Sequence, residues 1–155
     1  MTDIILRPIG YVKNTRLDMS DDFWGGIISE IELVDNLPAE TLDGIENFSH
    51  IEVFFHFHKV ELQKQIYSGH PRENPDWPVT GIFAQRKKNR PNRLGATIVK
   101  LKSRQGNKIF VENLDAINGT PVLDIKPVLK ELLPTGDIVQ PTWTSKLMDN
   151  YWTKK

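Results

Sequence analysis

The chain has 155 residues, enough for one domain with a real hydrophobic core and too few for two. Its 20 lysines and arginines balance its 20 aspartates and glutamates, which argues against a uniformly basic nucleic-acid binder and a uniformly acidic tail protein. The two signs are nevertheless separated along the chain. Residues 1–62 hold 12 acidic and four basic side chains, whereas residues 63–155 hold eight acidic and 16 basic ones. This separation suggests a partner that carries charge.

The sequence contains no cysteine, which excludes disulfide bonds, thiolate metal sites and cysteine nucleophiles and fits a reducing compartment. The N-terminal residues show no basic segment followed by an apolar run of signal-peptide length. No stretch approaches the roughly 18 uninterrupted apolar residues that a membrane span requires. We therefore expect a soluble cytoplasmic protein without a membrane partner.

Short alternating or apolar runs, bounded by Gly, Pro, Asn or Asp, predict strands along most of the chain. They cover residues 4–12, 26–34, 50–60, 81–84, 94–101, 108–114 and 122–125. Helical patterns are few and short, at residues 36–40, 127–133 and 145–152. Many short strands with few helices predict a mainly β fold: a small closed or nearly closed β-barrel with a few short helices, formed by residues 1–155 as one domain.

The longest segment without periodicity covers residues 68–80 and holds three prolines, which predict a loop. A loop of this length in a compact domain is usually functional or disordered. Trp77 within it favours ordered packing, because a disordered segment gains nothing from a large apolar ring.

Three of the four histidines fall in one strand-like run, residues 50–58. Alternation places His50, His56 and His58 on the face opposite the apolar side chains, so neighbouring imidazoles could share a ligand. The alternative is that these rings pair with backbone or carboxylate groups on a barrel wall. The spacing from His56 to Glu61 resembles part of a cupin metal motif, but Glu61 falls on the opposite face, so we predict no metal site.

A basic segment, residues 86–93, carries five cations with asparagine and proline between them. Proline prevents a regular helix, so the segment is predicted to be a loop between two strands. Guanidinium groups grip phosphates or carboxylates bidentately, while lysines act as point charges. We predict an anion or nucleic-acid contact here, with a solubilising loop as the alternative. The cations are Arg86, Lys87, Lys88, Arg90 and Arg93.

A tight Asn-Gly-Thr-Pro turn is predicted at residues 118–121, between two apolar runs. Its backbone amides, exposed at the tip, could cradle a small ligand, but turn chemistry alone favours a simple hairpin. The sequence has no glycine-rich phosphate loop, no Ser-His-Asp order and no zinc-ligand spacing.

Taken together and in this order, these segments resemble the TrmO family. The resemblance is strongest over residues 9–127, and residues 128–155 are expected to form a C-terminal extension that packs on the barrel. The matching motifs are Ile9-Gly10, Phe48-Ser49-His50, Phe57-His58, Gly81-Ile82-Phe83-Ala84 with Arg86, Asn89-Arg90-Pro91-Asn92 with Gly95, and residues 119–127, Gly-Thr-Pro-Val-Leu-Asp-Ile-Lys-Pro.

The resemblance implies a small β-barrel methyltransferase that uses S-adenosyl-L-methionine as its methyl donor. Family members methylate N6 of threonylcarbamoyl-adenosine, next to the anticodon in tRNA, and are typically homodimers. A tRNA anticodon stem-loop and a second copy of the chain are therefore the expected partners. The residues that the resemblance assigns to the donor are His58, Lys59, Arg86, Ala96, Ile117, Asn118, Gly119 and Thr120.

The target nitrogen is amide-like and a poor nucleophile until its proton leaves, so a general base would help. His50 and His58 are the candidates, because an imidazole titrates near neutral pH. The remaining cations of the basic segment are the expected substrate-binding residues, holding anticodon-stem phosphates. They are Lys87, Lys88, Arg90 and Arg93.

The chain departs from the family pattern in several places. Lys87-Lys88 replaces Ser-Pro, Ala96 replaces a leucine, and Asn118 replaces an aspartate. The Pro-Arg-Gln that usually contributes to the donor site is missing near residues 20–25, and we expect the chain to lack the additional C-terminal domain of longer bacterial members. These departures leave two alternatives open: a methyltransferase acting on another RNA or a small molecule, and a non-catalytic or metal-binding barrel that uses His56 and His58.

Overall fold

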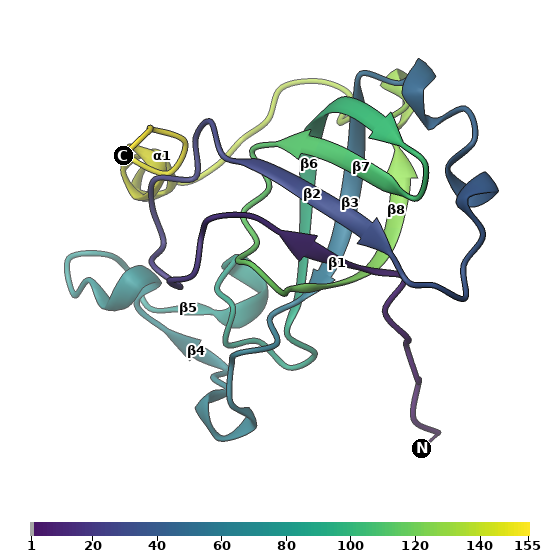
Figure 1. Cartoon of the computed structure of the whole chain (residues 1–155). Coiled ribbons are helices and arrows are strands. Elements are labelled where there is room, and N and C mark those ends of the chain that lie inside the picture. Colours follow the sequence, from purple (N-terminus) through teal and green to yellow (C-terminus); the bar gives the residue numbers. More distant parts are fainter. Residues whose placement is uncertain (1) are drawn as a thin grey trace.

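A computed structural model describes residues 2–155 and shows a mainly β protein built around a closed barrel (Figure 1). Six strands form the barrel, and a separate ribbon of two short strands lies outside it. The barrel strands are β1 (Gly10–Lys13), β2 (Ile28–Leu33), β3 (His50–His56), β6 (Leu94–Gln105), β7 (Lys108–Glu112) and β8 (Pro121–Pro127), and the ribbon is β4 (Ser68–Gly69) with β5 (Thr80–Gly81). The predicted fold class is confirmed.

The strands follow the order β1-β2-β7-β6-β3-β8, and every neighbouring pair is antiparallel. β1 closes the ring because it pairs on both sides: Gly10 lies opposite Leu33 of β2 and opposite Val122 of β8. Closure leaves no unpaired strand edge within the barrel.

Alternation along β3 sorts its side chains between the core and the outer surface, as predicted. Ile51, Val53 and Phe55 are buried, whereas the residues between them face outward and are half-buried. Phe55 packs so closely against β6 that a Cβ added at Gly95 would lie 2.4 Å from its ring. The absence of a side chain at residue 95 therefore lets the core aromatic fit.

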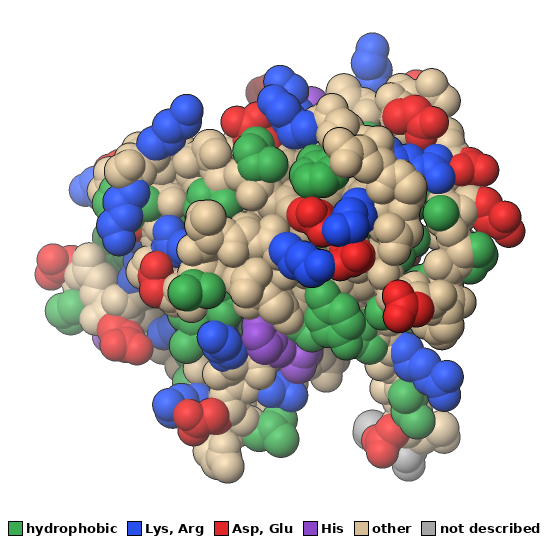
Figure 2. All heavy atoms as spheres, viewed as in Figure 1, with side chains coloured by type: hydrophobic (Ala, Val, Ile, Leu, Met, Phe, Trp, Pro, Cys, Tyr) green, Lys and Arg blue, Asp and Glu red, His purple; other side chains and the backbone are tan. Residues whose placement is uncertain are grey.

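The outer face of β1, β2 and β7 is a ladder of paired charges. Lys108 Nζ lies 2.8 Å from Glu30 Oε1 and 3.3 Å from Glu32 Oε1, and Lys13 donates to Glu32. Figure 2 shows the two signs interspersed over this face. These partly exposed pairs balance one another, so this face offers a ligand no surplus of either charge.

Helices are short and lie outside the barrel. The 3-10 helices are Ala39–Leu42, Ile45–Asn47, Leu62–Lys64, Pro71–Glu73, Ile82–Ala84 and Lys130–Leu132, and the α-helix is α1 (Thr142–Met148). No helix of residues 2–155 has the length and apolar character needed to cross a bilayer.

The C-terminal residues 150–153 lie against residues 23–25. The amides of Phe23 and Trp24 donate to the carbonyls of Asn150 and Tyr151 over 3.0 and 2.8 Å. A Cβ added at Gly25 would lie 1.9 Å from the carbonyl oxygen of Trp152. The two backbones approach this closely because residue 25 has no side chain.

Several predicted boundaries differ from the structure. β1 begins at Gly10 rather than at residue 4, because the neighbouring strands pair with it only from that point. β3 ends at His56, where the chain turns, rather than continuing to residue 60. Only the first residue of the predicted strand 81–84 is extended in β5, and the rest forms a 3-10 helix.

The predicted helices lie near the observed helical segments, but most of those segments are short 3-10 helices. Residues 36–40 contain only the first half of a 3-10 helix, residues 127–133 contain one short 3-10 helix, and β8 extends to Pro127. The C-terminal helix begins at Thr142, three residues before the predicted start. Trp77, in the long loop, packs against Trp143 of this helix with 6.1 Å between ring centroids, as expected for an ordered segment.

Replacing Gly95 with alanine should destabilise the barrel by about 1–3 kcal/mol, because the added methyl group must displace the Phe55 ring. Urea unfolding of the purified variant measures the change. Gly69→Ala is the matched control, since a Cβ there meets no atom within 4 Å. Equal stability of the two variants would contradict this account of the core.

Candidate functional site

Segments carrying most of the predicted site residues meet at one end of the barrel. β3 ends there at His56, opposite Leu94 of β6, and β8 begins nearby at Pro121. We call this the site end; it is the lower end of the barrel in Figure 1. The other end, where β3 begins, is the far end.

The turn that follows β3 carries His58 and the exposed Lys59. The amide of Val60 donates to the carbonyl of Phe57 over 3.1 Å, which closes the turn. Arg93 fixes it from the side: its carbonyl accepts from the Phe57 amide at 2.8 Å, and its Nη1 donates to the Val60 carbonyl over 2.6 Å. Arg93, a predicted substrate residue, thus orders the turn that presents His58.

The imidazoles of His56 and His58 are both shifted toward the neutral form. Burial is the main cause in each case, and the neighbouring cations Arg93 and Lys59 respectively add to it. The pKa of each ring lies below the ordinary value of 6.5. At neutral pH both rings are therefore able to accept a proton.

Arg86 lies beside β6, where its Nη2 donates to the carbonyl of Ala96 over 2.5 Å. The side chain is exposed. Within residues 2–155 no carboxylate oxygen comes within 4.0 Å of its guanidinium nitrogens. A guanidinium has five N–H groups in a planar fork, so Arg86 retains donors for an anionic group of a ligand.

The turn predicted at residues 118–121 is present, but its amide groups are already hydrogen-bonded within the protein. The amides of residues 118–120 donate to the carbonyls of Arg16, Val12 and Ile117 over 2.7, 2.7 and 3.2 Å. These three amides, which were expected to be exposed at the tip, are therefore already bonded within the protein. The turn is instead held by hydrogen bonds to β1 and to the loop that follows β1.

Of the four turn residues assigned to the donor, only Asn118 and Gly119 are exposed, whereas Ile117 and Thr120 are buried. A Cβ at Gly119 would meet nothing within 4 Å, so the tip is open. Asn118 Oδ1 accepts from the Asn14 amide, which leaves the NH₂ group of its side chain as the donor on offer.

Both lysines predicted to bind substrate are already close to carboxylates. Lys87 Nζ lies 3.6 Å from Glu73 Oε1, and Lys88 Nζ lies 2.9 Å from Asp21 Oδ1. Lys88 also donates to the carbonyl of Met19 over 3.2 Å. The lysines therefore tie the basic segment to two acidic neighbours from other parts of the chain.

The rest of the basic segment is held by backbone contacts. Arg90 Nη1 donates to the Gln85 carbonyl over 3.0 Å. Asn89 Nδ2 donates to the Lys64 carbonyl over 2.9 Å, and its own carbonyl accepts from the Ile66 amide at 3.0 Å. The segment is thus an ordered loop.

Arg16 is a buried cation that the sequence alone did not single out; its side chain is 7% exposed. Its guanidinium donates to the carbonyls of Ser20, Asp22 and Phe23 over 3.1, 2.9 and 3.1 Å. Its central carbon lies 4.3 Å from the centroid of the Trp24 ring, a cation–π distance. Residues 18–24 therefore wrap around the Arg16 side chain and are held there by its hydrogen bonds.

Asp115 was also missed, although it lies just before the turn in sequence. Its Oδ1 accepts from the Thr97 hydroxyl of β6, and its Oδ2 accepts from the Tyr151 hydroxyl. A carboxylate three residues before a predicted ligand-binding turn was the available signal. The contact with Tyr151 spans 36 residues and follows from tertiary structure alone.

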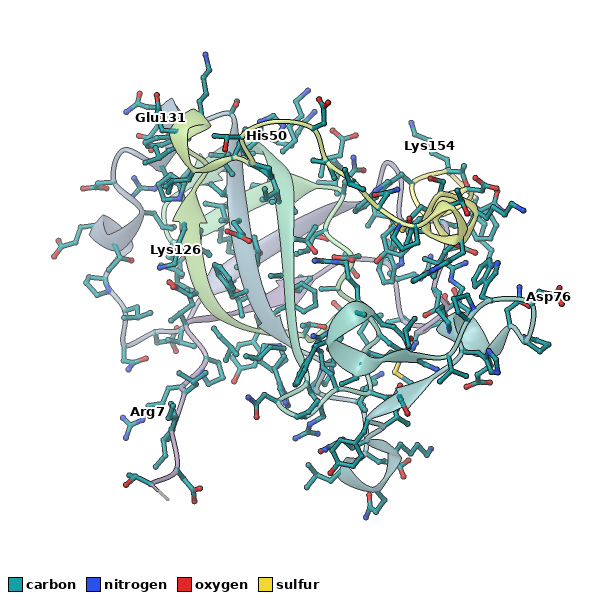
Figure 3. The ribbon with its side chains drawn as sticks, turned by 180° about the vertical axis from the view of Figure 1, so that it is seen from behind. Arg7, His50, Asp76, Lys126, Glu131 and Lys154 are labelled. Carbon is teal, nitrogen blue, oxygen red and sulfur yellow. The ribbon has the colours of Figure 1, made fainter. Side chains whose placement is uncertain are left out.

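The two candidate bases are at opposite ends of the barrel. His50 is exposed at the start of β3, where the Ser49 hydroxyl lies 2.8 Å from its Nδ1 (Figure 3). Six residues of strand, about 20 Å, separate it from His56. The structure therefore brings together His58, Arg86, Ala96 and the turn, but not His50.

A metal site would need several ligands close together. Among residues 2–155 no group of three or more His, Cys, Asp or Glu side chains is placed to hold a metal ion. His56 and His58 are neighbours without a third ligand of this kind.

Comparison with known proteins bears on what this site end is for. A family model described as the tRNA-methyltransferase O N-terminal domain matches residues 21–132. The chain belongs to the TrmO family. The resemblance that the motifs indicated is confirmed.

Two relatives show what share of a longer protein's length this TrmO chain covers. A human protein named tRNA (adenine(37)-N6)-methyltransferase is 38% identical over 119 residues, which are 76% of this chain and 26% of the human protein. A Pyrococcus abyssi protein named a probable S-adenosyl-L-methionine-binding protein is 34% identical over 132 residues, which are 83% of this chain and 70% of the archaeal one.

Solved structures of TrmO share the fold. A crystal structure of TrmO from Pseudomonas aeruginosa matches with a TM-score of 0.71 and 25% identity, over 89% of this chain and 62% of that one. Another TrmO crystal structure gives a TM-score of 0.72 and 26% identity, over 90% and 61%. The chain thus spans less than two thirds of these proteins and about a quarter of the human relative.

Proposed function

We propose that this protein is an S-adenosyl-L-methionine-dependent methyltransferase that methylates N6 of threonylcarbamoyl-adenosine beside the anticodon of tRNA. Membership of the TrmO family and the printed activity of the human relative support this reaction. The observation that carries it is structural: separate motif segments converge on the site end, where Arg86 donates to the Ala96 carbonyl of β6 and the turn containing Asn118 leads into β8. We place the protein in the cytoplasm, which its lack of cysteine fits.

The residues at the site end fit the donor chemically. The donor carries a carboxylate, which suits the exposed guanidinium of Arg86, and an adenosine whose acceptors suit the amide of Asn118. Gly119 leaves space at the turn tip. When bound, S-adenosyl-L-methionine supplies an electrophilic methyl group on a sulfonium.

In this reaction the protein positions the acceptor, excludes water and removes a proton. We assign the base role to His58 rather than His50, because only His58 lies at the site end. Its lowered pKa keeps the Nδ1 or Nε2 lone pair available at neutral pH.

We assign the tRNA anticodon stem-loop to the basic segment and the neighbouring Lys59. Arg90 and Arg93 each use one N–H group on a carbonyl, so their other N–H groups remain for phosphates. A base in a loop is partly unstacked and therefore cheaper to capture than one in a duplex.

A second candidate is the same methyl transfer to another RNA or to a small molecule. The pairing of Lys87 and Lys88 with Glu73 and Asp21 favours it, because two of the four predicted phosphate contacts are already occupied.

The defining experiment incubates the purified protein with S-adenosyl-L-methionine labelled in its methyl group and with total tRNA. We expect label in tRNA that carries threonylcarbamoyl-adenosine and none in the same tRNA lacking that modification. Donor binding by calorimetry without label in tRNA would favour the second candidate. Absence of donor binding would rule out both.

The pH dependence tests the assignment of His58. Since burial lowers its pKa, the acid limb of the activity profile, where the imidazole gains a proton, should have its midpoint below pH 6.5. His58→Gln should lower kcat about 100-fold and abolish this acid limb. The matched change His50→Gln should leave the profile intact; the reverse result would move the role to His50.

We further propose that the protein acts as a homodimer that uses the outer face of β3 and β6. This face, nearest the viewer in Figure 3, exposes Leu94 and Ile98 beside the half-buried Phe54. It adjoins Arg86 through Ala96, so a second copy there would border the site. Exposed aliphatic side chains next to a polar site are a common feature of subunit interfaces.

Ile98→Asp should convert the dimer to a monomer, as measured by light scattering after size exclusion. Ile28→Asp is the matched control, because Ile28 also lies on a barrel strand and is equally exposed, at 47%. Dissociation of both variants, or of neither, would contradict the assignment of this face.

A further inference from the structure

Asp115 stands out at the site end as a carboxylate without a cationic partner. Its side chain is half-buried, and within residues 2–155 no lysine, arginine or histidine nitrogen lies within 4.0 Å of it. The acidic residues of the neighbouring loop differ in this respect. Asp18, Asp21 and Asp22 lie 3.3, 2.9 and 2.7 Å from nitrogens of Arg16, Lys88 and Arg72, respectively.

The carboxylate of Asp115 is held in a fixed orientation by two hydroxyl groups. Thr97, which is 9% exposed, donates to Oδ1, and Tyr151 donates to Oδ2. An ionised carboxylate offers about four lone-pair directions, so two remain for a further donor. The charge is thus oriented by the protein without being neutralised by it.

The Tyr151 hydroxyl is a permanent donor in this arrangement. Burial is the main cause that raises its pKa far above the ordinary range, and the charge of Asp115 adds to the effect. The backbone contacts of residues 150–153 with residues 23–25 hold the ring in place. Asp115 is therefore positioned from the barrel wall on one side and from the C-terminal segment on the other.

Arg86 is bound to the same stretch of β6 as Asp115 but is not paired with it. The Ala96 carbonyl that accepts from Arg86 belongs to the residue before Thr97, and the guanidinium charge also acts on Tyr151. An oriented negative charge and an available positive charge thus lie within one small region. This arrangement suits a ligand that carries both charges, as the methionyl end of S-adenosyl-L-methionine does.

We propose that Asp115 binds the cationic part of the methyl donor, its ammonium or sulfonium group, with Tyr151 and Thr97 as positioning residues. The inference rests on the proposed function and adds a ligand-binding residue to it.

Calorimetry with three probes tests this assignment. S-adenosyl-L-methionine carries carboxylate, ammonium and sulfonium; S-adenosylhomocysteine lacks the sulfonium; 5′-methylthioadenosine lacks all three charges. Asp115→Asn should weaken S-adenosyl-L-methionine at least about tenfold, as expected for a hydrogen bond to a charged group, and leave 5′-methylthioadenosine unchanged. A matching loss for S-adenosylhomocysteine would identify the ammonium as the contact; a much smaller loss would identify the sulfonium.

Asp43→Asn is the control, since that carboxylate pairs with Arg104 at the far end, 2.8 Å away. Unchanged S-adenosyl-L-methionine affinity in Asp115→Asn, or an equal loss for 5′-methylthioadenosine, would overturn the inference. Should Asp115→Asn fail to fold, Tyr151→Phe keeps the charge and removes one positioning group. It should weaken only the charged probes, by about threefold to tenfold, and equal affinities would overturn the inference. Wild-type protein that binds no donor would instead refute the proposed function itself.

Discussion

The buried guanidinium of Arg16 is the interaction on which the site end depends. It satisfies carbonyls of the loop that follows β1, and the folded loop then presents backbone amides to the C-terminal segment. That segment in turn delivers the Tyr151 hydroxyl to Asp115. A single cation near the N-terminus thus determines where residues from the other end of the chain lie. Burial of such a charge is tolerated because carbonyls, a carboxylate and an aromatic face surround it.

The separation of charge along the sequence has a largely internal explanation. Acidic residues of the first part pair with cations of the second, as Asp22 does with Arg72 through two hydrogen bonds of 2.7 and 2.9 Å. The barrel wall shows the same pattern, with Lys108 of β7 between glutamates of β2. An asymmetry that suggested an external partner therefore also serves to join distant segments of the protein to one another.

The barrel and the inner face of β3 could be predicted from the sequence, because alternation and turn residues are local properties. The start of β1 could not, since it depends on how far β2 and β8 extend beside it. Alternation also placed His50 and His58 on one face of a single strand, although β3 carries His50 to the far end and ends before His58. Partners such as Asp21 for Lys88, 67 residues apart, arise only when the chain is folded.

The ion pairs of the basic segment affect how strongly the affinity of a bound RNA would depend on salt. On an open basic surface, phosphates displace diffuse counterions, and affinity falls steeply with salt. Here a phosphate that reaches Lys88 must take it from Asp21, so one anion is exchanged for another and few counterions are released. Such exchange favours a ligand whose shape matches several contacts of the site at once. It disfavours a polyanion that offers only negative charge. In the RNA complex proposed above, Asp21 therefore competes with phosphate for Lys88 and disfavours nonspecific nucleic acid.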